Sequence, residues 1–420
     1  MLKAHGLTTY IRDANLRVVA QLDDARELTV VPRHNRVGSW TMSLSAGSDK
    51  AALLDPKQGG ANPGGGIQVY TDDGDTLMSG PITNFQWDRS GSEDNTGTLT
   101  INGSDDNVYL ARWLVWPNPA AAITAQANPF RQVSGASTSV ETMIRNLVSE
   151  QAGPTNHVSR QRIPFLSLPT SLNRGTATAL RRNFRFETLI EAMADIAEAA
   201  TTGLSAPANR GGIGFRLVQE GTQLVLRIFE TVDRVETAKF SFENGTLADA
   251  NYGVSAPNTS HLILGAGRTA AFTDGPQVAK NLVLYTRTDQ WFPSVYAESF
   301  EDVGEINPAD GDVSAQMQAA ADQHFDTESG QVGISMTPID TDSLQYFRDW
   351  QVGDFVTIEL PYITLQERVR EATITYGNDD ILRATALVGT VDGQYARRSP
   401  GFLKRITDLT KLLKKKETTV

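Results

Sequence analysis

The sequence predicts an α+β fold that is mostly β, in which two β-rich regions enclose an α+β insertion and a helix ends the chain. Three observations lead to this prediction. Apolar and polar residues alternate with the two-residue period of half-buried strands through the first 110 residues and again after residue 211. Two segments between these regions have the apolar spacing of amphipathic helices. The length, 420 residues, corresponds to about two to four domains.

The first predicted domain, residues 1–117, consists of short strands joined by turns. Its clearest alternation is that of Trp40, Met42 and Leu44. Glycine-rich stretches such as residues 59–66 interrupt the pattern, as turns do. Several short strands punctuated in this way are typical of an antiparallel barrel or sandwich.

The insertion, residues 118–210, is predicted to begin after two prolines that end the first domain. A first helix is expected where Thr138 and Glu141 can form a capping box and Gly153 can end the helix. A second helix is expected at about residues 186–200, which carry an apolar stripe. The stretch between the two helices is rich in proline and predicts loops.

The second β-rich region is assigned to residues 211–400. A hairpin is expected at 214–229, where two apolar runs flank a Gln-Glu-Gly-Thr turn. One helix is expected at about 312–325. Residues 401–420 form the predicted C-terminal helix, which is basic and amphipathic and is expected to pack on a neighbouring protein. Its apolar stripe consists of Phe402, Ile406, Leu409 and Leu413.

Composition excludes several classes of protein. The chain has no cysteine, which excludes disulfides, thiolate metal sites and a cysteine nucleophile. No apolar run approaches the length of a membrane span, and the N-terminus lacks the apolar core of a signal peptide. The formal net charge of −11 argues against a general nucleic-acid binder, because phosphate contacts need a basic surface.

Motifs for catalysis and cofactor binding are missing. Residues 262–270 read as a strand followed by G-x-G-x-x-A, but the next residues cannot continue as the helix that a dinucleotide site requires. The five histidines have no chelating spacing, and G-x-S-x-G does not occur. We therefore expect no enzyme, no cofactor and no metal, and name no catalytic, cofactor-binding or metal-binding residue. A triad or a carboxylate pair assembled from distant residues stays open.

Two segments have charge of one sign. Residues 151–186 contain no acid and six arginines, which are Arg160, Arg162, Arg174, Arg181, Arg182 and Arg185. Residues 288–347 contain twelve acidic residues and neither lysine nor arginine. The two segments are either solvated faces or complementary patches that meet between neighbouring copies. From the acidic segment we select, as candidates for an interface or a channel lining, Glu298, Glu301, Asp302, Glu305, Asp310 and Asp312.

Several motifs together resemble the tail-tip or baseplate hub family, the minor tail proteins of siphophages that infect actinobacteria. The resemblance covers about residues 7–390, and its order of motifs is more specific than any single one. The motifs are Gly38-Ser-Trp-Thr-Met-Ser-Leu44, Ser79-Gly-Pro-Ile-Thr83, Leu99-Thr-Ile-Asn-Gly-Ser-Asp-Asp106, Leu110-Ala-Arg-Trp-Leu-Val-Trp-Pro-Asn-Pro119, Phe240-Ser-Phe-Glu-Asn-Gly-Thr-Leu247 and Leu264-Gly-Ala-Gly267.

The resemblance implies a homotrimeric virion protein in which each chain contributes two small tail-tube-like β-barrel domains to a ring. Such a hub joins the tail tube to the receptor-binding proteins and forms part of the DNA ejection channel. Its implied partners are further copies of itself, the distal tail protein, the tape measure protein and other tail-tip or receptor-binding proteins. DNA is met only in transit, and an acidic lumen would repel it. Assembly is expected in the cytoplasm of the bacterial host.

Two other functions remain open on the sequence. One is a tail-associated hydrolase that cuts cell-wall polymer. The other is a carbohydrate- or receptor-binding tail module, which is supported only by the six tryptophans. Most of these tryptophans lie in or beside strand patterns, which favours a place in the core. They are Trp40, Trp87, Trp113, Trp116, Trp291 and Trp350.

Overall fold

The computed structural model forms two compact units, residues 1–250 with 336–388 and residues 251–335 with 389–420, and each is described by itself. The described residues are 7–55, 65–71, 73–89, 96–126, 128, 130–135, 138–153, 155–156, 162–175, 181–199, 212–254, 261–266, 281–286, 298–303, 317–318, 321, 332–339, 341, 343–377 and 382–389.

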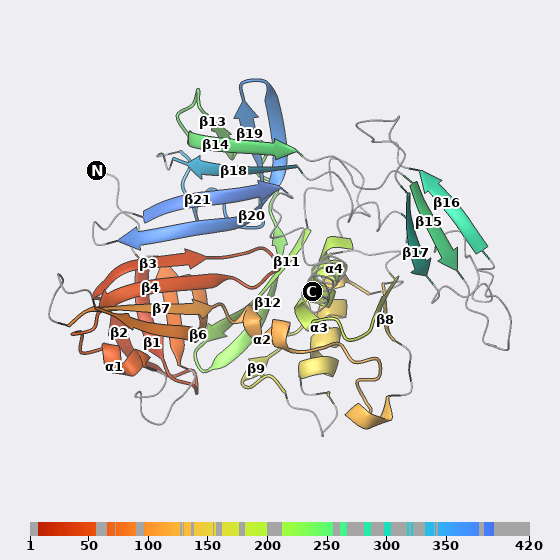
Figure 1. Cartoon of the computed structure of the whole chain (residues 1–420), viewed down its shortest axis with the longest axis horizontal. Coiled ribbons are helices and arrows are strands. Elements are labelled where there is room, and N and C mark those ends of the chain that lie inside the picture. Colours follow the sequence, from red (N-terminus) through yellow and green to blue (C-terminus); the bar gives the residue numbers. More distant parts are fainter. Residues whose placement is uncertain are drawn as a thin grey trace, which may run out of the picture. The chain divides into compact units, whose positions relative to one another are not determined.

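The first unit begins with seven strands and a short helix that form an antiparallel β structure (Figure 1). Its apolar residues alternate as predicted, so that Trp40, Met42 and Leu44 are buried. The elements are β1 (Leu7–Arg12), β2 (Val18–Leu22), β3 (Ala25–Val31), β4 (Ser39–Ser45), α1 (Ala51–Leu54), β5 (Gly66–Thr71), β6 (Thr76–Asp88) and β7 (Thr98–Ser104).

Strand β6 belongs to two sheets. Its first half pairs with β5, and its second half, from Ile82, pairs with β7. The change of partner follows Gly80, where a Cβ atom would lie 1.8 Å from the carbonyl oxygen of Ser104. Only glycine allows the two backbones to approach this closely, so Gly80 makes the corner between the sheets possible.

The second β-rich region joins the first in one sheet, because β20 pairs with β3 over Ile374–Gly377 (Figure 1). The strand order is β14-β18-β21-β20-β3-β4-β7-β6-β5-β1-β2, and off this path β19 pairs with β20 while β13 pairs with β19. In the described residues this path is open at both ends and forms no closed barrel. The added strands are β13 (Lys239–Ser241), β14 (Leu247–Val254), β18 (Val332–Pro338), β19 (Phe355–Leu360), β20 (Ile363–Gly377) and β21 (Leu382–Gly389).

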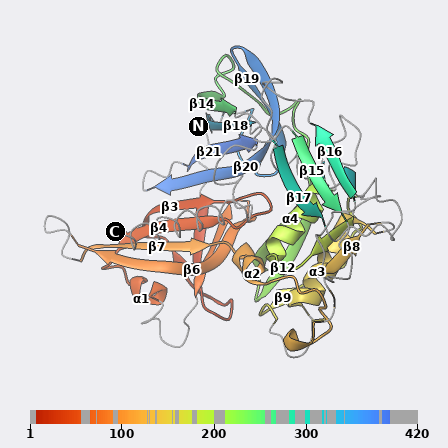
Figure 2. The same ribbon diagram turned by 45° about the vertical axis from the view of Figure 1, so that its right-hand side comes forward.

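The two helices of the insertion pack against the hairpin at the start of the second predicted β-rich region, around one apolar core (Figure 2). The hairpin β11–β12 confirms the predicted one, and both predicted helices are present. The elements are α2 (Asn107–Arg112), η1 (Ile123–Ala125), β8 (Arg131–Ser134), α3 (Val140–Ala152), β9 (Leu166–Ser167), β10 (Arg181–Phe184), α4 (Leu189–Ala199), β11 (Gly212–Glu220) and β12 (Gln223–Thr231).

The predicted capping box at the first of these helices is wrong. The side chain of Ser139, not Thr138, caps α3 by accepting the Thr142 N–H, and the carboxylate of Glu141 lies elsewhere. The reciprocal box occurs instead at α4. There the Thr188 hydroxyl accepts the Glu191 N–H, and the Glu191 carboxylate accepts the N–H of Thr188.

The second unit contains a three-stranded sheet in which β15 (His261–Ala266) lies between β16 (Asn281–Thr286) and β17 (Glu298–Val303). Of the helix predicted at 312–325, residues 317, 318 and 321 are described and helical, and Met317 and Ala321 are buried. The predicted C-terminal helix, with Phe402, Ile406, Leu409 and Leu413, lies outside the described residues.

Candidate assembly interface

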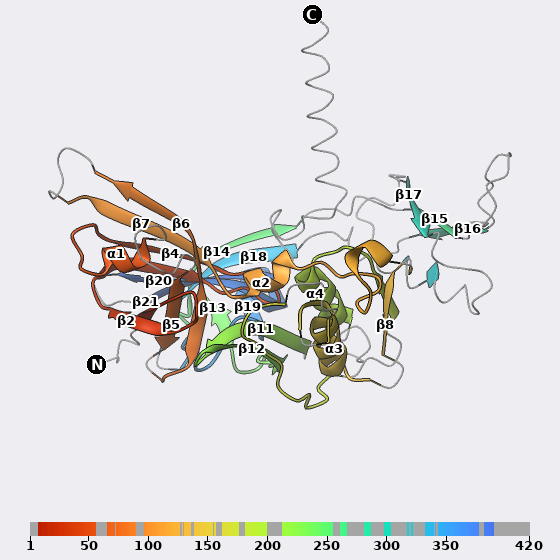
Figure 3. The same cartoon turned by 90° about the horizontal axis from the view of Figure 1, so that it is seen from below.

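Three strand edges along the path of the joined sheet have no partner in the described part of the chain: those of β14 and β2 at the ends of the path, and that of the second half of β6 within it. At one end β14 pairs only with β18. Beyond its pairing with β5, the second half of β6, Thr83 to Asp88, pairs only with β7, beside which it runs in Figure 3. None of these β6 residues is buried, and Trp87 is 55% exposed. Open edges present unpaired N–H and C=O groups, which can pair with a strand of another chain.

The insertion is attached to the sheet by side chains that occupy the outer edge of β11. The amide oxygens of Asn35 and Asn107 accept the N–H groups of Phe215 and Leu217, each at 2.8 Å. The hydroxyl of Ser79 accepts the next alternate N–H, that of Gln219, at 2.9 Å. These three side chains accept the N–H groups along the edge of β11, as a neighbouring strand would. This edge is therefore not available to pair with a strand of another chain.

A buried ion pair reinforces this attachment. The guanidinium of Arg12 donates two hydrogen bonds to Asp106, at 2.5 and 3.0 Å, and a third to the side chain of Gln219. The side chains of Arg12 and Asp106 are 1% and 0% exposed. The Ser79 hydroxyl also donates to Asp106, so the sheet and the insertion share one buried network.

Asp105, next to this network, is a buried carboxylate that lacks a full set of hydrogen bonds. Its Oδ1 atom is buried and has no hydrogen-bond partner in the described residues. Burial, with the neighbouring charge of Asp106, raises the pKa of Asp105 to about 7, although backbone hydrogen bonds from Gly38 and Asn107 oppose the rise.

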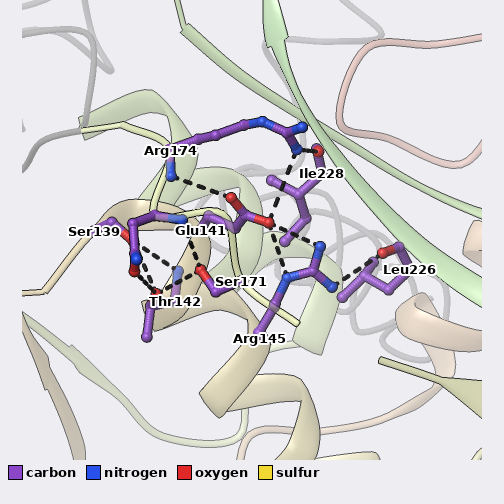
Figure 4. Close-up of polar contacts among 9 residues, drawn as sticks. Ser139, Glu141, Thr142, Arg145, Ser171, Arg174, Leu226 and Ile228 are labelled. Atoms are coloured by element: carbon purple, nitrogen blue, oxygen red, sulfur yellow. Dashed lines mark hydrogen bonds and ion pairs between the residues drawn. The ribbon is translucent and has the colours of Figure 1, made fainter. Parts of the chain in front are cut away.

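A second ionic cluster lies at the start of α3 (Figure 4). Glu141 is fully buried and accepts hydrogen bonds from the Arg145 side chain at 3.0 and 2.9 Å and from the Arg174 N–H at 3.1 Å. Arg145 and Arg174 also donate to the backbone oxygens of Leu226 and Ile228 on β12. Burial acts to raise the pKa of Glu141, but the bonds from Arg145 and the backbone outweigh it and lower the pKa. The cluster is therefore structural, and it holds the loop that leads to Arg174 against the start of α3.

The six predicted arginines do not form one cluster. Arg174 and Arg182 are paired within the chain, with Glu141 and Asp195. The others are placed as follows: Arg162 is exposed, Arg181 lies on β10, the Arg185 guanidinium stands 5.6 Å from the ring centre of Phe186, and Arg160 lies outside the described residues. Their role in an interface stays a prediction.

Half of the predicted acidic candidates are described. They are Glu298, Glu301 and Asp302, all on β17. Glu305, Asp310 and Asp312 lie outside the described residues. On β17, Phe300 is 60% exposed, and β15 places it in one row with Leu284 of β16, which is 55% exposed.

The tryptophans divide between core and surface. Trp40 and Trp350 are 1% exposed, and the indole N–H of Trp40 donates to a backbone oxygen. Trp113 and Trp116 are partly buried, and Trp291 lies outside the described residues. Trp87 on the free half of β6 is the exposed one among those described.

The described residues offer little for small-molecule chemistry. Two open hollows of about 300 and 280 Å³ lie on either side of the ion pair between Arg131 and Glu150. Within the described residues no cluster of His, Asp and Glu could hold a metal ion. Nor does any helix in that part of the chain have the length and apolarity to cross a membrane.

The assembly features were missed by the sequence analysis for a common reason. The free edges and the side-chain-capped edge of β11 depend on strand neighbours that are distant in the sequence, as Asn35 and Phe215 are. The one local signal is the pattern after Gly80, where polar residues on both sides of Phe85 indicate a strand exposed on both faces.

Comparison with known proteins gives a family. The sequence model described as "Siphovirus ReqiPepy6 Gp37-like protein" matches residues 8–390. No curated protein matches the sequence. Two solved structures share the fold: the tail protein from Neisseria meningitidis MC58 (13% identity, 93% of this chain and 98% of that one, TM-score 0.52) and the 43 kDa tail protein of prophage MuSo2 from Shewanella oneidensis (13% identity, 92% and 98%, TM-score 0.51).

Proposed function

The chain belongs to the siphovirus ReqiPepy6 Gp37-like family of tail proteins, and from this we propose that it is the hub of a phage tail tip. It is a virion tail component of the structural kind. In the proposal, three copies form a ring that joins the tail tube to the receptor-binding proteins and forms part of the DNA ejection channel. The distal tail protein, the tape measure protein and other tail-tip proteins are its proposed neighbours.

The observation that carries this proposal is a pair of open edges, on β14 and on the second half of β6, which bound one run of strands in the joined sheet. The path from β14 to the second half of β6 contains eight strands, which are β14, β18, β21, β20, β3, β4, β7 and β6. When β6 of one copy pairs with β14 of the next, both edges are satisfied. Such a head-to-tail contact closes into a ring if the rotation between copies divides a full turn.

The tail-tube-like barrels of this proposal would be completed between chains. The charged segments, 151–186 and 288–347, then supply candidate contacts to neighbouring copies or tail-tip partners. Opposite charges at such contacts set the register of assembly more than its affinity.

Cross-linking between the two edges tests the ring. Because the chain has no cysteine, only the introduced thiols can react with the cross-linker. In the double variant Gln86→Cys/Ala248→Cys, one cysteine lies on the free half of β6 and one on β14, both at exposed positions. A short bismaleimide should give a covalent trimer of about 137 kDa, three times 45.7 kDa, on a denaturing gel.

The matched control places the first cysteine on β2, the open strand at the far end of the path from β14. Gln21→Cys/Ala248→Cys uses exposed Gln21 of β2, and it should yield no covalent trimer. Equal yields from both variants, or only monomer from the first, would overturn the proposed pairing.

A further inference from the structure

One face of the joined sheet is built almost entirely from hydroxyl and amide side chains. Paired residues of an antiparallel ladder point to the same side. The register therefore places two rows of polar side chains across the sheet. One row runs from β20 to β6, and the other runs from β3 to β6. The first row is Thr375, Thr29, Thr41, Asn102 and Asn84, and the second is Glu27, Ser43, Thr100 and Gln86.

The opposite face of the same strands is apolar and buried. There Leu28, Met42 and Ile101 stand in one row and are at most 3% exposed. The core of the chain therefore covers this side. The polar rows remain partly open, with Thr41 and Gln86 exposed.

The polar face carries few charges, and they nearly cancel. Neighbouring rows add Ser45, Thr98 and Asp88, and the Arg26 guanidinium donates to the Thr98 hydroxyl at 3.1 Å. Among the described side chains, the charged positions on this side are Arg26, Glu27, Arg33, Asp88 and Glu371, and Arg33 forms an ion pair with Glu371.

Part of the hydrogen-bonding capacity of the face is used within it. The hydroxyls of Thr29 and Thr375 lie 3.2 Å apart, and the Thr41 hydroxyl donates to the Asn102 oxygen at 2.9 Å. Cross-strand bonds of this kind hold the side chains in place. Fewer donors are then left for an external anion.

The size of the proposed ring decides which face points inward. Three copies of the eight-strand path, at about 4.8 Å per strand and with the tilt of a barrel, give a ring about 35 to 50 Å across at the backbone. That space is wide enough for a DNA duplex. It is too narrow for the parts of the three copies that pack over the apolar face of the sheet. The bare polar face must then line the channel.

We infer that this uncharged hydroxyl and amide face is the surface along which duplex DNA slides. The inference rests on the proposed ring. Tight binding of DNA comes from cations that neutralise phosphates and release counterions. A face without a net positive charge does not release counterions from DNA and so gains no binding free energy in this way. DNA can therefore touch the face without binding tightly to it. The inference assigns the lining to this face and leaves the acidic segment 288–347 to interfaces.

Labelling by reagents of two sizes tests the position of the face. Thr41→Cys places a thiol in its first row, and Thr124→Cys places one at an exposed position of the insertion outside the segment 151–186. In the assembled trimer, a small maleimide should label both variants fully. A polyethylene-glycol maleimide too bulky for the channel should label Thr124→Cys fully and Thr41→Cys only at background.

The outcomes separate this inference from the proposed function. A chain that stays monomeric overturns the ring and the lining with it. A trimer in which Thr41→Cys reacts with both reagents places the face outside the channel. A trimer in which it reacts with neither buries the face in a contact. Either trimer result overturns the lining alone.

A charge variant tests the chemistry of the face. Thr41→Lys/Thr100→Lys adds six lysines per trimer to the rows, and the trimer should then hold DNA with an affinity that falls by about 10³-fold between 50 and 200 mM salt. Thr124→Lys/Ser134→Lys adds the same charge at exposed positions of the insertion outside the segment 151–186 and should not hold DNA in this way. Equal DNA binding by the two variants would contradict the inference.

Discussion

Arg12 shows how a single charged residue is tolerated in a core. Its side chain is almost wholly removed from water, and the cost of that transfer is offset by the two bonds to Asp106 and the bond to Gln219. The sequence could not reveal this pairing, because Arg12 and Asp106 are 94 residues apart and neither lies in a charge pattern.

Removal of Arg12 should therefore be costly. Arg12→Ala leaves the Asp106 carboxylate buried without its cation, and the free energy of unfolding should fall by about 3–5 kcal/mol. The control is Arg227→Ala, which breaks a pair with Glu220 whose side chains are 52% and 38% exposed, and should cost less than about 1 kcal/mol. Denaturant unfolding measures both, and equal losses would contradict the account.

Asp105 should make stability depend on pH. Its pKa is raised from 3.8 to about 7 by burial, so the folded chain keeps a proton that the unfolded chain releases. The stabilisation is complete below about pH 4 and is lost as the pH rises through 7. Asp105→Asn should flatten this slope in denaturant midpoints from pH 4 to 8. Asp88→Asn, at an exposed carboxylate, should leave it unchanged, and a slope unaltered by Asp105→Asn would refute the assignment.

At the scale of elements, the helices show both the power and the limit of local patterns. The apolar spacing predicted α3 and α4 correctly, because their buried stripes are set by neighbouring residues. The cap of α3 was displaced by one residue, because Thr138 and Ser139 can both cap in principle. Glu141 does not take part in a capping box because it is buried against Arg145. That burial depends on strand β12, to which Arg145 also donates a hydrogen bond.

Two cap variants test the correction. Ser139→Ala removes the acceptor of the Thr142 N–H and should lower the free energy of unfolding by about 1 kcal/mol. Thr138→Ala should stay within about 0.5 kcal/mol of the unchanged chain. Thermal or denaturant unfolding separates them, and the reverse order would restore the box predicted from the sequence.

The edge of β11 gives a further prediction at this scale. Asn35 has a φ of 52° and bonds both Ile213 and Phe215. Asn35→Ala should cost about 2–3 kcal/mol, because it loses two hydrogen bonds and because alanine tolerates the left-handed region less well than asparagine does. Asn35→Gly should cost less, since glycine accepts this conformation.

Hydrogen exchange of the Phe215 amide locates the effect. Its protection should fall in Asn35→Ala and persist in Asn173→Ala, where an exposed asparagine with a φ of 57° is replaced. Unchanged protection of Phe215 in Asn35→Ala would show that β11 is held by other contacts.

At the scale of the whole molecule, the sequence predicted the β-rich regions and the insertion but not how they join. Alternation reports which residues of a strand are buried, and not which strand lies beside it. The pairing of β20 with β3 connects residues more than 300 positions apart, and the run of strands between the open edges of β14 and β6 follows from it. The family resemblance, confirmed over residues 8–390, supplied the expectation of a ring that local patterns could not.

The most direct test of the central claim is a three-dimensional electron-microscopy reconstruction of the assembled chain. The account predicts a three-fold ring in which residues 82–88 of β6 pair with β14 of the next copy. The row of Thr29, Thr41 and Asn102 should face the channel. A two-fold dimer, or a ring in which both edges stay open to solvent, would contradict it.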